Sequence, residues 1–184
     1  YCRQLPKAIM TGLGFADFDM EGRYIQADYE NLSVACLLAP GAEQDNEEQQ
    51  GRKNEFFELF ANHLQKVRNK RREFIICGNW NIAHTAADVQ DTESNSTTSG
   101  FLAEERQWMS ELLESGYVDA FREINSDQDE FSWWPDGSQE SNGWRTDYHV
   151  ISQGLKYTVD YGAIYKSKVF SSHAPVIMDY DIEL

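Results

Sequence analysis

A hydrophobic run that stops at a glycine is the most constraining feature of this chain. Phe74-Ile75-Ile76-Cys77 has the pattern of a buried strand, and Gly78-Asn79-Trp80-Asn81 follows it as a tight polar turn. A buried strand with polar groups at its carboxyl end is how α/β proteins build binding sites. The polar groups here are amides and the imidazole of His84, and the first carboxylate after the strand is Asp88. A hydrolytic metal site would need a carboxylate closer to the strand end.

The charge of the chain is strongly acidic and unevenly distributed. Its 184 residues carry 31 Asp and Glu against 16 Lys and Arg, which gives a net charge of −15. A protein with this balance is poorly suited to binding a phosphate backbone unaided. A basic stretch nevertheless forms a candidate partner or RNA surface, made of Lys66, Arg68, Lys70, Arg71 and Arg72 with the adjacent Glu73. The alternative interpretation is a solvated helix end, where cations favour the helix dipole.

Length and composition indicate one folded domain over residues 1–184. Hydrophobic residues make up 41% of the chain, and it has no internal repeat. No apolar run reaches 18 residues and no signal peptide is visible, so we expect a cytoplasmic protein without a membrane span. The three cysteines, Cys2, Cys36 and Cys77, show no metal-binding spacing and are interpreted as reduced core thiols. Cys77 with His84 would give only two ligands, which is a weak zinc signal.

The order of predicted elements favours an α/β fold with a layered sandwich architecture. Alternation and apolar runs predict an antiparallel meander within residues 6–38, followed by an acidic, mobile segment over 42–51. Helical spacing predicts one helix from about Arg52 and another over 103–115. Further strands are predicted after Glu73 and near residues 146–151, 157–164 and 176–180, with a short element at 118–122 and an aromatic strand at 131–135.

Several short motifs occur in one order along the chain. They include Gly78-Asn79-Trp80-Asn81, then Gly143-Trp144-Arg145-Thr146-Asp147-Tyr148, then Ser172-His173-Ala174-Pro175. The order resembles the exonuclease III / AP endonuclease members of the endonuclease–exonuclease–phosphatase superfamily over nearly the whole chain. The resemblance implies the layered α/β sandwich of that superfamily, here lacking its N-terminal third. It also implies that relatives hydrolyse phosphodiesters with Mg²⁺ or Mn²⁺.

The motifs depart from the family pattern where carboxylates belong. The resemblance implies an Asp at the positions of Asn79 and Ser172, whereas Asn81, Asp147 and His173 match the pattern as they stand. Loss of a general base costs about 10²–10⁴ in rate. Loss of the carboxylate behind a catalytic His costs up to about 10⁴ by analogy with serine proteases. We therefore expect these five positions to be vestigial, with no active catalytic residue and no bound metal.

A closer resemblance accounts for the missing carboxylates. Gly12-Leu13-Gly14-Phe15, Lys70-Arg71-Arg72-Glu73 and Trp133-Trp134-Pro135-Asp136 are similar to the catabolite repression control (Crc) proteins, a branch without nuclease activity. This resemblance implies a post-transcriptional regulator that acts with Hfq on A-rich mRNA, binds RNA weakly alone and needs no cofactor. The alternative is a weak metal-dependent phosphodiesterase that uses Mg²⁺ or Mn²⁺. The retained Asn81, Asp147 and His173 favour that alternative.

Residues near the C-terminal motifs admit two interpretations. Trp133, Trp134 and Trp144 could stack on bases. Alternation along an extended segment places Trp133 and Trp134 on opposite faces, so we expect at least one of them to pack in the core. Asp147 is either a retained site residue or a partner of Arg145. We expect the pairing with Arg145, because the neighbouring site carboxylates are missing.

Overall fold

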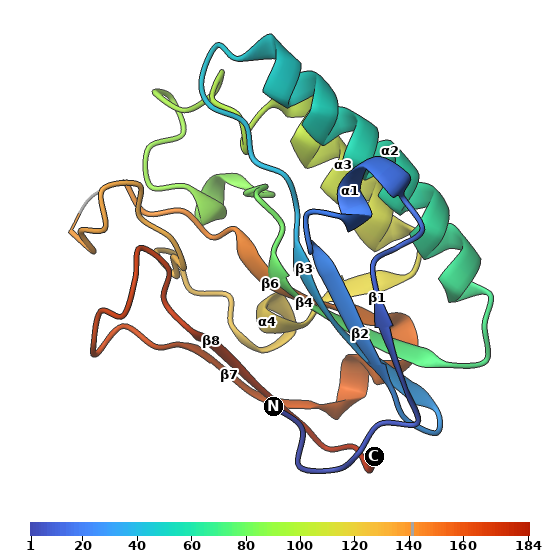
Figure 1. Ribbon diagram of the computed structural model, residues 1–184. Coiled ribbons are helices and arrows are strands. Elements are labelled where there is room, and N and C mark those ends of the chain that lie inside the picture. Colours follow the sequence, from blue (N-terminus) through green and yellow to red (C-terminus); the bar gives the residue numbers. More distant parts are fainter. Residues whose placement is uncertain (141) are drawn as a thin grey trace.

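A six-stranded mixed sheet is the centre of the computed structural model, which describes residues 1–140 and 142–184. The strands lie in the order β1-β2-β3-β4-β6-β5 (Figure 1). Neighbouring strands are antiparallel except β3 and β4, which run parallel. The strands are β1 (Ala8–Thr11), β2 (Tyr24–Asp28), β3 (Leu32–Leu38), β4 (Glu73–Asn79), β5 (Tyr117–Asp119) and β6 (Asp147–Ser152).

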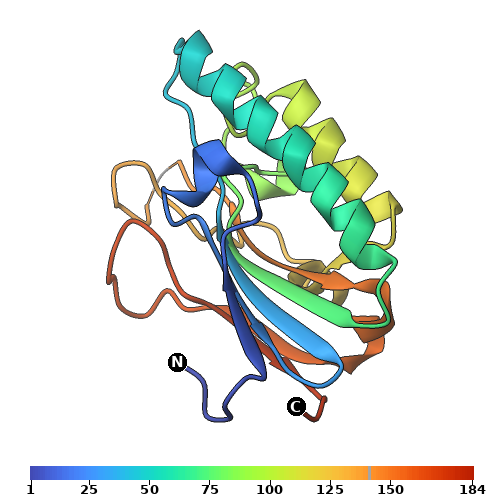
Figure 2. The ribbon, with the colours of Figure 1, turned by 45° about the vertical axis from the view of Figure 1, so that its right-hand side comes forward.

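Two long helices cover one face of this sheet. Helices α2 (Glu47–Arg68) and α3 (Ala103–Glu114) lie side by side across it, with the short α1 (Ala16–Asp19) beside α2 (Figure 2). The apolar positions of α2 recur every three or four residues and are buried, which gives the helix one face toward the core. They are Phe56, Phe57, Phe60, Leu64 and Val67. These side chains pack on the sheet against Tyr24, Ile76 and Val150.

A second, two-stranded sheet packs on the opposite face. It consists of β7 (Val159–Ile164) and β8 (Val176–Tyr180), with α4 (Ala120–Ile124) beside it. The two sheets meet in a cluster that includes Ile75, Ile151 and Met178. Short 3₁₀ helices at Ala86–Asp88 and Gln153–Thr158 complete the elements. The order of helix layer, large sheet and small sheet confirms the predicted layered α/β sandwich.

Most predicted elements are confirmed, but two predictions are wrong. Helix α2 begins at Glu47 rather than near Arg52, because the Asn46 side chain accepts the Gln49 N–H at 3.0 Å and caps the helix. Part of the segment predicted as mobile is therefore helical. Residues 131–135 form no strand, since Trp133 makes only isolated bridges with Trp144 and His173.

The prediction of core thiols is also wrong. Cys2 and Cys36 are exposed, and Cys77 is half-buried. Cys36 and Cys77 lie on the sheet face that turns toward β7 and β8, and that second sheet is narrower than the first. None of the helices in the described ranges is long and apolar enough to cross a membrane.

A buried ion pair ties the helices to the turn after β4. Lys53 Nζ lies 2.6 Å from Glu105 Oε1, and the two side chains are 1% and 2% exposed. Lys53 also donates to the Asn81 carbonyl at 2.8 Å, while Glu105 Oε2 accepts the Gly100 N–H at 2.6 Å and the Leu102 N–H at 3.0 Å. One pair of charges thus joins α2, α3, the loop before α3 and the turn at Asn81.

We expect Lys53→Met to lower the free energy of unfolding by about 3–5 kcal/mol, because Glu105 would remain as a buried charge without its partner. Lys66→Met is the matched control, since Lys66 is an exposed lysine of the same helix. The double variant Lys53→Met/Glu105→Leu should recover part of the loss. Urea denaturation measures all three, and equal midpoints for Lys53→Met and Lys66→Met would contradict the assignment.

Candidate functional site

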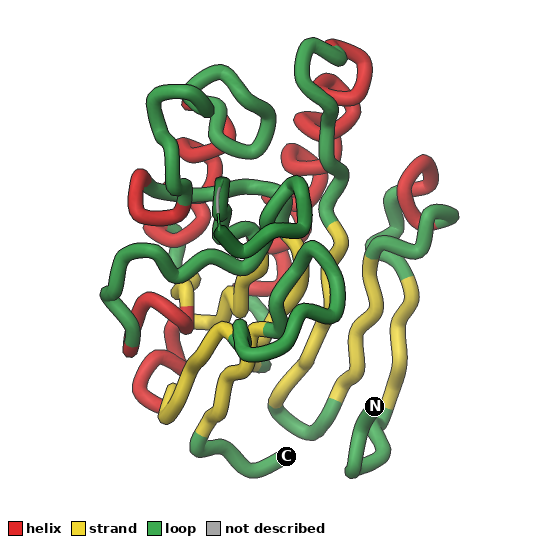
Figure 3. The backbone as a smooth tube through the Cα atoms, turned by 90° about the vertical axis from the view of Figure 1, so that its left-hand side faces the viewer, coloured by secondary structure: helices red, strands yellow, loops and turns green. Residues whose placement is uncertain are grey.

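The candidate site begins where β4 ends. Asn79, the last residue of β4, lies directly opposite Asp147, the first residue of β6. Gly78 has a φ of +133°, and a Cβ there would collide with the carbonyl oxygen of Leu37. Glycine is therefore required for β4 to approach β3 this closely. The long loops gather at one end of the strands, as Figure 3 shows.

The centre of the site is a hydrogen-bonded His–Asp–Ser set. His173 Nδ1 lies 2.8 Å from Asp147 Oδ2, and the buried Ser132 hydroxyl donates to the same oxygen at 2.7 Å. Ser132 Oγ in turn accepts the Thr146 and Asp147 N–H groups, both at 3.2 Å. Because a carboxylate oxygen accepts the Nδ1 proton, the set fixes the tautomer and leaves Nε2 as the free ring nitrogen. The His173 side chain is 34% exposed, so substrate can reach it.

The expected pairing of Asp147 with Arg145 is wrong. The Arg145 guanidinium binds two other carboxylates, Asp88 Oδ1 and Asp119 Oδ2, each at 2.7 Å. Asp147 is the carboxylate that orients His173, whereas the resemblance to the nuclease family predicts that carboxylate at position 172. The carbonyl of Ser172 accepts the Trp134 N–H at 3.0 Å. The substitution at position 172 therefore leaves the histidine with its acidic partner.

Two amide side chains shape the floor of the site. Asn79 Oδ1 accepts the Asn81 N–H at 2.8 Å, and Asn81 Nδ2 donates to the Ala39 carbonyl at 2.7 Å. Asn81 has a left-handed φ of +51°. It lines a cavity of about 70 Å³ whose walls include Lys53, Ser99, Trp133, Trp144 and Thr146. His84, the imidazole of the same turn, instead bonds to Ser110 of α3 at 2.8 Å.

The tryptophans divide between core and site. Trp134 is buried in a cluster with Phe121 and Phe131, and Trp144 is also buried. Trp133 is half-buried, and its ring centroid lies 6.0 Å from that of His173. Trp133 and Trp134 thus have different surroundings, and the prediction that at least one of them packs in the core is confirmed. Trp133 is the tryptophan whose ring lies beside His173.

The residues present do not fit a divalent cation by themselves. Among residues 1–140 and 142–184, no group of three or more His, Cys, Asp or Glu side chains is arranged to hold a metal ion. At the strand ends the donors are the amides of Asn79 and Asn81 and the carboxylate of Asp147, one oxygen of which already serves His173 and Ser132. Mg²⁺ prefers one or two free carboxylates in near-octahedral geometry. We therefore derive no chemical step through a metal.

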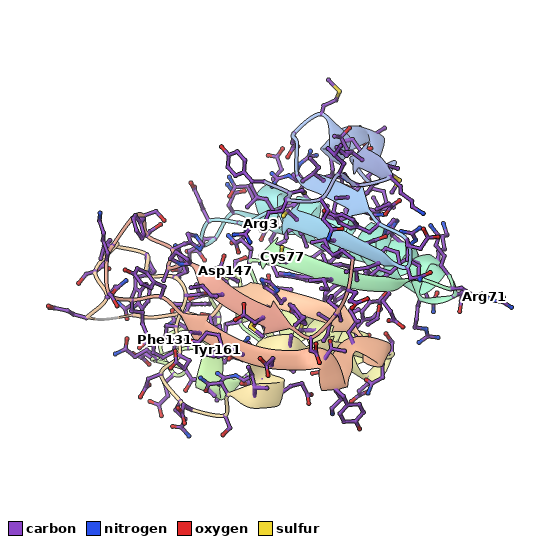
Figure 4. The ribbon with its side chains drawn as sticks, turned by 90° about the horizontal axis from the view of Figure 1, so that it is seen from below. Arg3, Arg71, Cys77, Phe131, Asp147 and Tyr161 are labelled. Carbon is purple, nitrogen blue, oxygen red and sulfur yellow. The ribbon has the colours of Figure 1, made fainter. Side chains whose placement is uncertain are left out.

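The basic stretch lies at the other end of β4. Glu73 begins that strand and Asn79 ends it, and Figure 4 shows Arg71 well apart from Asp147. Two of its arginines serve the fold, since Arg72 donates to the Tyr29 carbonyl at 2.8 Å and Arg68 donates to the Ser115 carbonyl. Lys66, Lys70 and Arg71 are exposed and Glu73 is half-buried. The partner-binding role of this stretch stays a prediction.

A buried charge network supports the strand that carries Asp147. Asp88 Oδ1 accepts from Arg145 at 2.7 Å and from Arg122 at 2.8 Å. Burial alone would raise the pKa of Asp88, but the two guanidinium groups outweigh it and lower the pKa to about 2. Asp88 has the lower pKa in the folded state, so protonation favours unfolding. Its contribution is complete above about pH 4 and is lost as pH falls toward 2.

We expect acid to remove about 2 kcal/mol of stability through Asp88 alone between about pH 4 and pH 2. Asp88→Asn should be less stable than the wild type at neutral pH and should lose less on acidification. Urea denaturation across this pH range gives both slopes. Parallel pH profiles for the two proteins would show that Asp88 does not carry the effect.

Proteins that resemble this chain in sequence or fold carry the names of DNA-processing enzymes. The chain is 31% identical over 180 residues to an exodeoxyribonuclease of Bacillus subtilis, covering 96% of this chain and 71% of that protein. It is 31% identical over 186 residues to a DNA-(apurinic or apyrimidinic site) endonuclease of Dictyostelium discoideum, covering 98% of this chain but only 51% of that protein. The solved 3′-5′ exonuclease of Neisseria meningitidis superposes with a TM-score of 0.88 at 22% identity, covering 98% and 73% of the two chains. No family model matches the chain.

The fold and the strand-end site define a protein of the endonuclease–exonuclease–phosphatase type. The identity to the Bacillus enzyme over 71% of its length shows that this chain belongs to the exonuclease III / AP endonuclease family. The prediction of a regulator without nuclease activity is wrong, because the relatives that match along the chain are named as nucleases. Hfq and A-rich mRNA followed only from that regulatory role, and as partners they stay a prediction.

Proposed function

We propose that this chain is a phosphodiesterase that acts on DNA, with His173 at the scissile phosphate. The observation that carries the proposal is the 2.8 Å hydrogen bond between His173 Nδ1 and Asp147 Oδ2 in a chain related to DNA nucleases. An imidazole held by a carboxylate at one nitrogen presents the other nitrogen in a fixed direction. Such a pair supplies the general acid or the charge stabilisation that phosphodiester cleavage needs.

In this scheme His173 stabilises the charge that develops on the phosphate. In the protonated form, Nε2–H donates to a phosphate oxygen, where negative charge grows as the bond to the leaving oxygen lengthens. Asp147 stabilises the positive imidazole, and Ser132 holds the carboxylate in place. Trp133 lies beside the ring and offers a flat surface to a neighbouring base or sugar. In this scheme these residues bind and orient the substrate and donate a proton to it.

The missing element is a base for the attacking water. Asn79 occupies the position beside Asp147 where the family pattern has a carboxylate, and an amide cannot accept a proton. General-base assistance contributes about 10²–10⁴ in rate. We therefore expect a slow phosphodiesterase that has a general acid, His173, but lacks a general base at position 79.

Substitution of the histidine tests the proposal directly. We expect His173→Gln to lower the rate of DNA cleavage by about 10²–10⁴, because glutamine cannot donate a titratable proton. Asp147→Asn should lower the rate by up to about 10⁴ with little change in DNA affinity, since the ring loses its tautomer. The assay follows an abasic-site duplex and a 3′-end substrate with Mg²⁺ or Mn²⁺ in the buffer. His84→Gln is the matched control, and equal loss in both histidine variants would contradict the assignment.

Restoring a carboxylate at position 79 tests whether the missing general base limits the rate. Asn79→Asp should raise the rate of DNA cleavage by about 10²-fold or more, because Asp adds a proton acceptor opposite Asp147. The Asp oxygen can still accept the Asn81 N–H, so the turn is kept. The gain should vanish in Asn79→Asp/His173→Gln. A rate unchanged by Asn79→Asp, in a folded variant, would reject the assigned deficit.

A further inference from the structure

Two cysteines face each other across the parallel pair of strands. Cys36 of β3 and Cys77 of β4 are register partners, and their Sγ atoms lie 3.6 Å apart. Neighbouring strands are about 4.8 Å apart, and a disulfide needs Cα atoms separated by about 4.4–6.8 Å. The backbone spacing is therefore suited to a bond, and side-chain rotation would bring the sulfur atoms to about 2.0 Å.

The two thiols have unequal surroundings. Cys36 is exposed, whereas Cys77 is half-buried and its Sγ lies 3.2 Å from the Ala35 carbonyl. The hydrogen bond between the sulfurs lowers the pKa of Cys36 and raises that of Cys77. Since the thiolate is the reactive form of cysteine, Cys36 is the sulfur that an oxidant meets first.

We propose that Cys36 and Cys77 are an oxidation site at which a peroxide closes a disulfide between β3 and β4. The Cys36 thiolate attacks the peroxide, so that an S–O bond forms, the O–O bond breaks, and the hydroxide that leaves takes up the proton lost by the Cys36 thiol. The Cys77 sulfur then attacks Cys36, so that the S–S bond forms, the S–O bond breaks, and the second hydroxide takes the Cys77 proton. Two thiols and one hydrogen peroxide give one disulfide and two water molecules.

The bond would lie just before the candidate site. Cys36 precedes Leu38 by two residues and Cys77 precedes Asn79 by two, and these are the last residues of their strands. Beyond the strand ends, the Asn81 amide bridges the same two segments through the Ala39 carbonyl. Closure of the disulfide alters the spacing on which this bridge depends. This link to the site rests on the proposed cleavage of DNA.

Peptide mapping tests the bond itself. The reduced protein is treated with hydrogen peroxide, alkylated, digested and analysed by mass spectrometry. We expect one cross-linked peptide pair containing Cys36 and Cys77, lighter by two hydrogens than the separate peptides and released by dithiothreitol. Cys2→Ser is the matched control and should give the same pair. Cys36→Ser should give none, and Cys77→Ser should stop at a Cys36 sulfenic acid that dimedone labels.

Either of two results would contradict the proposed disulfide. Alkylation of both thiols after peroxide, in protein with an unchanged circular dichroism spectrum, would reject it. A dimer on a non-reducing gel that joins two copies through Cys36, with Cys77 still free, would do the same.

Cleavage of DNA before and after oxidation tests the link to the site. We expect a roughly tenfold or larger loss that dithiothreitol reverses, because small displacements at a reacting centre are costly. Cys36→Ser should show no such loss. Unchanged cleavage by the disulfide form would reject the link and leave the bond. Absence of cleavage by the reduced protein would count against the proposed function, while the peptide map would still decide the bond.

Discussion

The buried guanidinium of Arg145 is the interaction on which the site depends. It lies between Asp88, in the 3₁₀ turn after β4, and Asp119, at the end of β5, and its side chain is 1% exposed. A buried charge is tolerated only when its partners are close and well oriented. The pairing therefore fixes the segment that enters β6, and Asp147 follows two residues later. The position of His173 is set through that aspartate.

Most elements of the fold can be predicted from the sequence. The strand before Gly78 and the spacing of Phe56, Phe60 and Leu64 were sufficient, because burial imposes its period on the sequence. The hydrogen-bond partners of the site residues cannot be predicted from the sequence. Nothing in the order of residues says that Asp147 meets His173 rather than Arg145, since this depends on which strands are neighbours. Ser132 had no signal at all, because its role is a hydrogen bond to a residue 15 positions away.

The substitutions at Asn79 and Ser172 do not by themselves indicate that the site has lost its activity. Each removes a carboxylate from the family pattern, and both together suggested a site without chemistry. The geometry separates the two losses, because Asp147 holds His173 at Nδ1, whereas the side chain at position 79 is an amide that cannot accept a proton. A site can thus lose one carboxylate of the family pattern and keep its His–Asp hydrogen bond. Counting motif residues does not distinguish these cases.

Asn81 shows how retention of a residue can mislead in the other direction. Its backbone is left-handed, with a φ of +51°, a conformation in which Asn, Asp and His are enriched among residues other than glycine. Its side chain joins the ends of two parallel strands through the Ala39 carbonyl. Glycine could adopt this φ but has no side chain to donate to the Ala39 carbonyl. Glutamine has an amide, but its side chain is one methylene longer than that of asparagine. Architecture alone is enough to select asparagine at this position, so its presence in a sequence is no measure of whether that sequence still performs catalysis.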